Sequence, residues 1–140
     1  MSSSKPQKLK RPGYWFAVWD EWFDSPAYRD LSMPARCLLL EFQHIFRPSR
    51  NGELSISVQQ AMERLGCAKQ TAQDAFRELT EHGFIKLKEH ERWQERMARE
   101  WILTFERLNN HEPTDDWKQW KPGEPVFTLP RKRTQPRKAA

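Results

Sequence analysis

The chain has 140 residues, of which 37% are hydrophobic and 31% are charged, and its formal net charge is +5. A chain of this length fits one domain with tails or a small extension. It contains no apolar run near the roughly 18 residues of a membrane span, and its first residues lack the apolar core of a secretory signal. Its cysteines, Cys37 and Cys67, do not have the spacing of metal ligands. These features argue against a secreted or membrane protein and predict a reduced, cytoplasmic one.

The charge is unevenly distributed along the chain. Residues 1–12 carry four basic side chains and no acid, and residues 131–140 carry five and no acid. The segment 13–130 therefore holds the other 15 of the 24 basic residues against all 19 acids, a net charge of −4. Basic ends rich in Pro, Ser and Gln are typical of disordered tails. Such tails could contact phosphates without sequence preference, or they could only aid solubility.

An aromatic segment opens the predicted fold. The run Tyr14–Trp19 is typical of a β-strand, and it could complete a three-stranded sheet by pairing with a hairpin further along the chain. Trp15, Trp19, Trp22 and Trp101 fall on apolar-patterned segments, so we expect them in the core. The alternative is a surface that stacks the bases of single strands, which requires exposed aromatic rings interleaved with basic residues.

Two helices and a short strand are predicted next. Ser25 followed by Pro26 has the cap and first-turn signature of a short helix. Ser32 caps a longer helix in the same way. The apolar face of this second helix consists of Leu38, Leu39, Phe42, Ile45 and Phe46. After a loop at residues 47–52, Leu54 and Ile56 predict a short strand.

The stretch from Ser57 to Phe84 is the most informative part of the chain. Apolar side chains recur at spacings of three and four in a first helix, at Val58, Ala61, Met62 and Leu65. A second helix over Gln70 to Leu79 continues this period, at Ala72, Ala75, Phe76 and Leu79. Gly66 ends the first helix, and Gly83 ends the second because it can adopt a left-handed conformation. Two short helices around a tight turn are how many proteins set a helix into the DNA major groove.

Two strands are predicted after this pair of helices. Phe84 to Lys88 alternates apolar and basic residues, as a half-exposed strand does. Glu100 to Phe105 is the second strand candidate. The polar segment His90 to Arg99 lies between them and would form the tip of a hairpin.

These elements resemble a known family. The run LGCAKQTAQDAFRELTEHGFIKL is similar to the helix-turn-helix and first wing strand of bacterial winged-helix regulators and replication initiators, and RELTEHGFI is its most family-like part. The resemblance covers residues 31–105. It implies an α+β winged helix-turn-helix fold, with three main helices, a small antiparallel sheet and a β-hairpin wing.

The predicted domain organisation follows from this resemblance. Residues 13–108 would form the winged-helix domain, flanked by disordered basic tails at 1–12 and 131–140. Residues 109–130 would be a C-terminal extension that contains Trp and Pro. Within it, Asp115–Trp120 resembles the tryptophan-bearing tail after the wing in some phage and plasmid proteins. We expect its tryptophans to dock on the domain.

The start of a recognition helix faces the base edges of DNA. The predicted base-contacting residues are Lys69, Gln70, Thr71, Gln73, Asp74 and Arg77. Glutamine can bond adenine through two hydrogen bonds, lysine can donate to guanine, and a carboxylate can accept from cytosine N4. Contacts to the DNA backbone are expected from a helix N-terminus and from the wing. The residues predicted for them are Ser57, Gln59, Lys86, Lys88, Arg92, Arg96 and Arg99.

Two features depart from the family pattern. Ala68 stands where a Ser or Thr usually caps the recognition helix, at a cost of about 1 kcal/mol. The helix also carries more acidic than basic side chains, since Asp74, Glu78 and Glu81 stand against Lys69 and Arg77. A strong nonspecific DNA binder would be more basic. The competing hypothesis is a winged-helix module that binds another protein through the exposed helix face and Trp93.

No pattern of an enzyme is present in the sequence. The histidines share no ligand spacing, and no Gly-rich phosphate loop, nucleophile elbow or HExxH occurs. We therefore predict no catalytic residues, no metal and no cofactor.

The predicted partner is double-stranded DNA. The predicted role is transcriptional regulation in the nucleoid of a bacterium or its mobile elements, and a replication or recombination accessory would have the same fold and contact. The protein could act as a homodimer on DNA and could meet a protein partner through the wing or the C-terminal extension.

Overall fold

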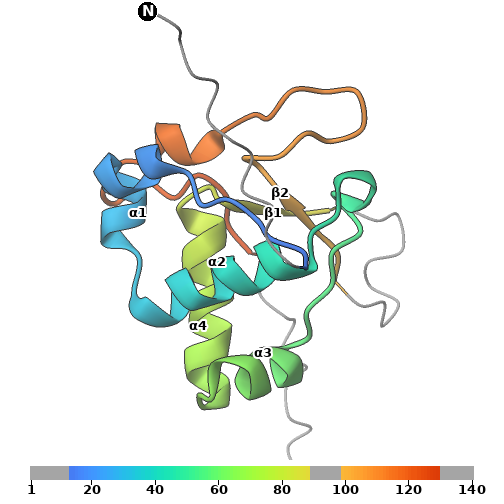
Figure 1. The fold of residues 1–140 in the computed structure, drawn as a ribbon. Coiled ribbons are helices and arrows are strands. Elements are labelled where there is room, and N and C mark those ends of the chain that lie inside the picture. Colours follow the sequence, from blue (N-terminus) through green and yellow to red (C-terminus); the bar gives the residue numbers. More distant parts are fainter. Residues whose placement is uncertain (1–12, 89–98, 130–140) are drawn as a thin grey trace, which may run out of the picture.

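The computed structural model describes residues 13–88 and 99–129, and Figure 1 shows its fold. The fold is α+β, and its helices and the two strands after them follow the predicted order. They are the 3₁₀ turn η1 (Asp20–Asp24), α1 (Pro26–Asp30), α2 (Met33–Ile45), η2 (Pro48–Arg50), α3 (Val58–Leu65), α4 (Lys69–Glu81), β1 (Ile85–Leu87), β2 (Trp101–Leu103) and η3 (Asp116–Gln119). Within the described ranges, no helix is long and apolar enough to cross a membrane.

Serine side chains begin three of the helices, as predicted for Ser25 and Ser32. The hydroxyls of Ser25, Ser32 and Ser57 accept hydrogen bonds from backbone N–H groups in the first turns of α1, α2 and α3. At α3 the bonding is reciprocal, because the Gln60 side chain also accepts from the Ser57 N–H at 2.9 Å. Such capping boxes satisfy N–H groups that a helix end leaves without partners.

Glycine ends both helices of the central pair. Gly66 follows α3 with φ +64°, and Gly83 follows α4 with φ +82°. The predicted inner face of α4 is confirmed, since Ala72, Ala75, Phe76 and Leu79 are all buried. This face packs on α2, which crosses α4 in Figure 1.

The sheet is smaller than the sequence predicts. β1 and β2 pair antiparallel, with Lys86 opposite Ile102. Leu54 adds an isolated bridge on the far side of β2, where the Trp101 N–H donates to its carbonyl at 2.8 Å. Ile56 is buried but forms no strand. Of the short strand predicted at Leu54 and Ile56, only the bridge at Leu54 is formed.

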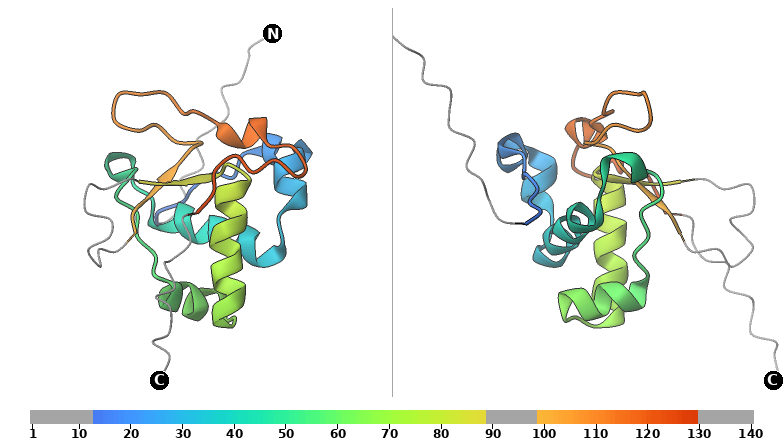
Figure 2. Two further views of the ribbon diagram at one scale, coloured as in Figure 1. Left: turned by 180° about the vertical axis from the view of Figure 1, so that it is seen from behind. Right: turned by 45° about the vertical axis from the view of Figure 1, so that its right-hand side comes forward.

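The predicted strand at Tyr14–Trp19 is wrong. Polar groups of α2 hold this segment instead of a neighbouring strand. The Gln43 side chain donates to the Ala17 carbonyl at 2.9 Å, and the Tyr14 hydroxyl donates to the Phe46 carbonyl at 3.2 Å. Figure 2 shows that the segment begins beside the C-terminal end of α2 and runs to η1. Aromatic residues favour strands because they fit a half-buried surface, and a helix can supply that surface as well.

The tryptophans divide between the core and the surface. Trp22 and Trp101 are buried as expected. Trp19 is half-buried, with its ring 5.6 Å from both Trp22 and Phe105. Trp15 contradicts the prediction because it is 61% exposed. It lies on the extended segment whose backbone contacts α2.

The C-terminal extension docks on the domain, which confirms the prediction. Trp117 is buried and stacks on Phe84, with ring centroids 5.8 Å apart. Trp120 stacks on His82 at 4.7 Å. Further along, the Val126 N–H donates to the carbonyl of Glu81 at 2.7 Å. The extension therefore contributes to the hydrophobic core and covers the C-terminal end of α4.

Polar side chains also fix the C-terminal end of α4. Glu78 accepts from the Ser32 N–H at 2.9 Å and from its hydroxyl at 2.6 Å, so it holds the start of α2. His82 is buried, and both of its ring nitrogens face acceptors. Nδ1 lies 2.6 Å from the Glu78 carbonyl, and Nε2 lies 2.7 Å from the Asp30 carboxylate.

Candidate nucleic-acid interface

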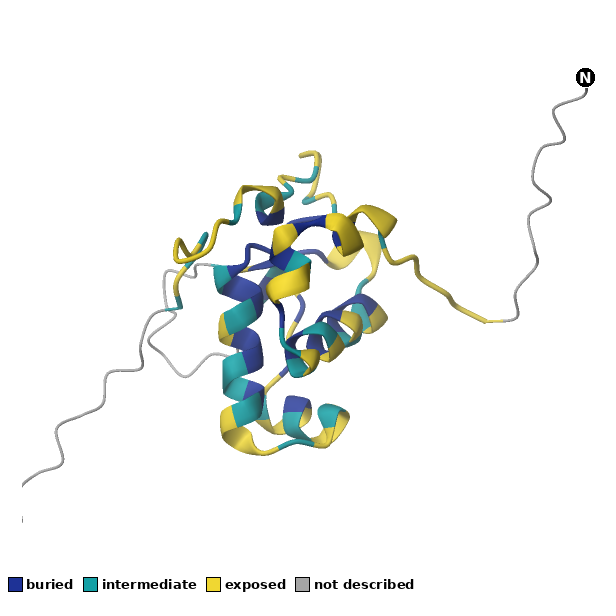
Figure 3. Cartoon of the chain, turned by 90° about the vertical axis from the view of Figure 1, so that its left-hand side faces the viewer, coloured by how far each residue is buried: buried dark blue, intermediate teal, exposed yellow. Residues whose placement is uncertain are grey.

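One side of α4 is polar and faces outward. Successive helix residues are rotated by about 100°, so positions 70, 73, 74 and 77 share a side opposite the buried apolar residues. Figure 3 shows this division along the helix. We call the exposed side the α4 polar face, and it comprises Lys69, Gln70, Thr71, Gln73, Asp74 and Arg77. Lys69, Gln70 and Arg77 are exposed, and the other three are half-buried.

Asp74 lies at the centre of the hydrogen bonding on this face. Its Oδ1 accepts from the Gln70 amide at 2.9 Å and from the Arg77 guanidinium at 3.0 Å. The side chains of Arg77 and Asp74 are 53% and 46% exposed. An ion pair this exposed contributes no more than about 1 kcal/mol. DNA could therefore separate these groups at little cost.

The start of α4 carries a positive partial charge that no side-chain cap satisfies. Ala68 is the N-cap residue, and its methyl group cannot accept a hydrogen bond. Lys69 follows at an exposed position. Backbone N–H groups at a helix start and a neighbouring cation both attract phosphate oxygens. The missing side-chain cap therefore leaves these donors available to an anion.

The predicted contacts at the start of α3 have partners within the protein. The Ser57 hydroxyl accepts from the Gln60 N–H at 3.0 Å. The Gln59 amide donates to Glu63 at 3.2 Å, and both Ser57 and Gln59 are exposed. The Ser57 hydroxyl can still donate its proton outward to a phosphate while it caps the helix.

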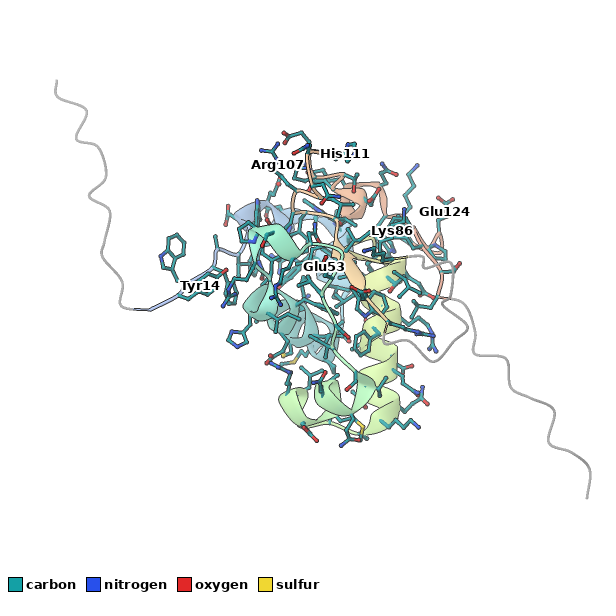
Figure 4. The ribbon with its side chains drawn as sticks, turned by 90° about the vertical axis from the view of Figure 1, so that its right-hand side faces the viewer. Tyr14, Glu53, Lys86, Arg107, His111 and Glu124 are labelled. Atoms are coloured by element: carbon teal, nitrogen blue, oxygen red, sulfur yellow. The ribbon has the colours of Figure 1, made fainter. Side chains whose placement is uncertain are left out.

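The predicted wing contacts are only partly described. Arg92 and Arg96, like Trp93, lie outside the described residues. Arg99 is exposed and Lys88 is half-buried at the two ends of this segment. The Lys86 ammonium lies 5.3 Å from the Phe127 ring centroid, and Figure 4 shows Lys86 on the same side as Glu124. Lys86 therefore lies against the C-terminal extension rather than alone on the sheet.

No candidate metal centre was found in residues 13–88 and 99–129, where no three His, Cys, Asp or Glu side chains cluster. Cys37 is exposed and Cys67 is half-buried, and both are free thiols. One carboxyl group outside the α4 polar face is perturbed. Burial raises the pKa of Glu106, and the nearby carboxylate of Asp115 raises it further. This carboxyl group belongs to the region where the C-terminal extension begins.

Two features of the surface were missed by the sequence analysis. The pairing of Asp74 with Gln70 and Arg77 could have been predicted, because spacings of three and four bring helix side chains together. The second feature is the exposure of Tyr14, Trp15 and Phe16 beside Arg47, whose guanidinium lies 3.9 Å from the Tyr14 ring centroid. The run Tyr14–Trp19 is rich in aromatic residues throughout, so its pattern does not indicate which rings are exposed.

No protein-family model, curated protein or solved structure matches this chain. Its function is therefore inferred from its own residues. The order α2, Leu54 bridge, α3, α4, β1 and β2 is compatible with a winged helix. Compatibility of fold alone does not specify function, so the chemistry of the α4 polar face carries the inference.

Proposed function

We propose that this chain is a winged helix-turn-helix protein that binds double-stranded DNA sequence-specifically, as a transcriptional regulator of a bacterium or mobile element. The observation that carries the proposal is α4 itself. Its inner side is buried against α2, while its N-terminal half exposes Lys69, Gln70 and Arg77 and leaves Thr71, Gln73 and Asp74 half-buried. A helix presented in this way can enter the major groove with its first turns against the bases.

The side chains of the α4 polar face suit the base edges of the major groove. Gln70 and Gln73 can each bond adenine N6 and N7, and Lys69 and Arg77 can donate to guanine O6 and N7. Thr71 can offer its methyl group to thymine or its hydroxyl to a phosphate. A good bidentate contact contributes about 1–3 kcal/mol of discrimination against the wrong base.

Asp74 gives this face selectivity rather than affinity. The Asp74 carboxylate repels phosphates. If Gln70 or Arg77 turns to a base, Asp74 loses the hydrogen bond that this side chain donates to it. A cytosine N4 amine can replace the lost donor. Sequences without such a donor leave the carboxylate desolvated and unsatisfied, which costs about 1–3 kcal/mol or more. Asp74 therefore disfavours wrong sites.

Contacts to the DNA backbone would come from both ends of the interface. Ser57 and Gln59 at the start of α3 can bond phosphates. On the wing side, Lys88 and Arg99 flank the segment that carries Arg92 and Arg96. Lys86 and the basic tails can add charge. These contacts fix orientation and do not discriminate between sequences.

Affinities for several duplex sequences, each measured over a range of salt concentrations, test which residues contact bases and which contact the DNA backbone. Gln70→Ala and Gln73→Ala should reduce discrimination between sites by about 1–3 kcal/mol per lost base contact. Arg92→Ala or Arg96→Ala should weaken all sites about equally and reduce the salt slope by roughly 1. If the wing variants change sequence preference and the glutamine variants do not, the two roles are reversed.

Two other functions share this fold. A replication or recombination accessory protein would make the same DNA contact, and only the bound sequence would identify it. A protein-interaction module would use the α4 polar face on another protein, and the net charge of −1 on the whole of α4, from Asp74, Glu78 and Glu81 against Lys69 and Arg77, favours that alternative. Duplex binding that shows little salt dependence would contradict the DNA proposal, because phosphate contacts release counterions.

A further inference from the structure

The strongest unexplained surface lies at the start of the described chain. Tyr14 is 56% exposed, Trp15 61% and Phe16 36%. Large aromatic side chains are favourable to bury, so three consecutive exposed rings mark a contact surface. We define the aromatic surface as Tyr14, Trp15, Phe16 and Arg47.

This surface is held in place by the fold. The Tyr14 hydroxyl donates to the Phe46 carbonyl at 3.2 Å, and Gln43 holds the Ala17 carbonyl at 2.9 Å. Beyond Ala17, Trp19 packs on Trp22 and Phe105. The aromatic rings therefore project from a segment that is anchored on both sides. Preorganised rings lose little conformational entropy when they bind a ligand.

A described cation, Arg47, lies directly beside the Tyr14 ring of the aromatic surface. The Arg47 guanidinium lies 3.9 Å from the Tyr14 ring centroid, and it donates to the His44 and Phe46 carbonyls at 3.2 and 2.7 Å. The chain that enters at Gly13 brings four basic residues and no acid in positions 1–12. Among the described acids nearby, Glu41 is paired with Arg64 at 3.0 Å, and burial raises the pKa of Glu106.

We propose that the aromatic surface binds single-stranded nucleic acid by stacking its bases on Tyr14 and Trp15. Exposed rings beside a cation form a stacking platform, and the guanidinium of Arg47 supplies positive charge for the phosphates. The bases of a duplex are stacked on one another, so only a single strand can offer its base faces. This site is separate from the α4 polar face and does not rest on the proposed duplex binding. Figure 4 shows Tyr14 on the opposite side of the molecule from Lys86, a β1 residue proposed to contact the DNA backbone.

A second copy of the chain is the less favoured occupant. Three partly exposed aromatic side chains offer on the order of 300 Å², because a whole aromatic side chain buries about 150–250 Å². A stable protein interface takes about 800 Å² from each partner. Two copies would also bring their basic segments together, and like charges oppose association. Area and charge both favour a polyanion.

Anisotropy titrations of full-length protein with short oligo(dT) and oligo(U) test the proposal. The Tyr14→Ala/Trp15→Ala variant should bind the better of the two about 5- to 150-fold more weakly for each stacked base that is lost. Met33→Ala is the matched control, because Met33 is an exposed apolar side chain at the other end of α2 and should leave binding unchanged. Equal melting temperatures would show that both variants fold. The relative affinities for the two oligomers identify DNA or RNA as the strand.

Three outcomes would overturn the proposal. One is equal single-strand affinity of wild type and Tyr14→Ala/Trp15→Ala, which would assign binding to the basic tails. Another is loss of single-strand binding in Lys69→Ala/Arg77→Ala while Tyr14→Ala/Trp15→Ala still binds, which would assign single-strand binding to the α4 polar face. The third is a concentration-dependent dimer that only the Tyr14→Ala/Trp15→Ala variant loses, without single-strand binding. Retained single-strand binding by Lys69→Ala/Arg77→Ala would support a separate site whether or not the duplex proposal holds.

Discussion

The two halves of α4 differ in what they contact. From Glu78 onward the helix is anchored to the rest of the protein, through Ser32, Asp30 and the docked C-terminal extension. From Lys69 to Arg77 the outward side chains contact mainly one another. Regions with few contacts to the rest of a protein unfold locally more easily than regions with many. Both halves are packed on the core through their inner side, but only the C-terminal half has its polar side chains bonded to other elements. The outward side chains of the N-terminal half are therefore the ones that a ligand could bind without disturbing the fold.

The largest expected effect is that of Gly83→Val at the anchored end. Gly83 has φ +82°, and a Cβ there would lie 2.8 Å from the backbone carbon of Asp116. The backbone strain and the clash with backbone atoms add to each other and should together cost roughly 5 kcal/mol or more. Urea denaturation should show severe destabilisation or no folding. Gly66→Val is the control, since Gly66 has φ +64° but open space among the described residues. Equal losses in both variants would contradict the close packing of the extension on Gly83.

Removing the docked tryptophan should have the next largest effect. Trp117 is buried on Phe84, and truncating a buried Trp to Ala typically costs about 3–5 kcal/mol. Trp117→Ala and truncation after Leu108 should both lower the melting temperature. Truncation after Leu129 serves as the control because it spares the docked segment. A melting temperature unchanged by truncation after Leu108 would mean that the extension does not stabilise the anchored half.

A gain of stability is expected at the free end of α4. Ala68 has φ −73° and ψ 161°, the same angles as Ser57, which caps α3. Ala68→Ser should therefore place a hydroxyl for the Thr71 N–H and stabilise the protein by about 1 kcal/mol. Thermal denaturation measures the gain, and Ser57→Ala should give a loss of similar size. If Ala68→Ser adds nothing, the start of α4 is already satisfied by other groups.

The smallest effect is a pH dependence where the extension begins. The pKa of Glu106 is raised by burial and by Asp115, so its charged form disfavours the folded state. The carboxyl group therefore contributes stability in acid, and that contribution is lost as the pH rises through the raised pKa. Glu106→Gln should stabilise the protein at neutral pH and give no gain at about pH 4. The exposed Glu53→Gln is the control, and a gain of equal size at both pH values would refute the assignment.

The pair α3–α4 was predictable because its signals are local. Ser57, Gly66 and Gly83 mark the helix ends, and the spacing of apolar residues gives the buried face. The polar side of α4 follows from the same period. These signals need only neighbouring residues, so a single sequence contains them.

The anchors of α4 could not be predicted in the same way. Glu78 bonds Ser32, and His82 bonds Asp30, across 46 and 52 residues of chain. The segment at Tyr14–Trp19 shows the same limit. Its composition favours a strand, but the surface that receives it is supplied by α2. Which element covers an apolar segment depends on the whole fold, not on that segment.

The central claim is that the free half of α4 contacts bases. The most direct measurement is selection of bound sequences from a random double-stranded DNA pool, with the full chain and with the Lys69→Ala/Arg77→Ala variant. We predict an enriched motif that the variant loses while its melting temperature is retained. No enrichment, or the same motif from both proteins, would contradict base contact by α4 and leave protein binding as the function of this face.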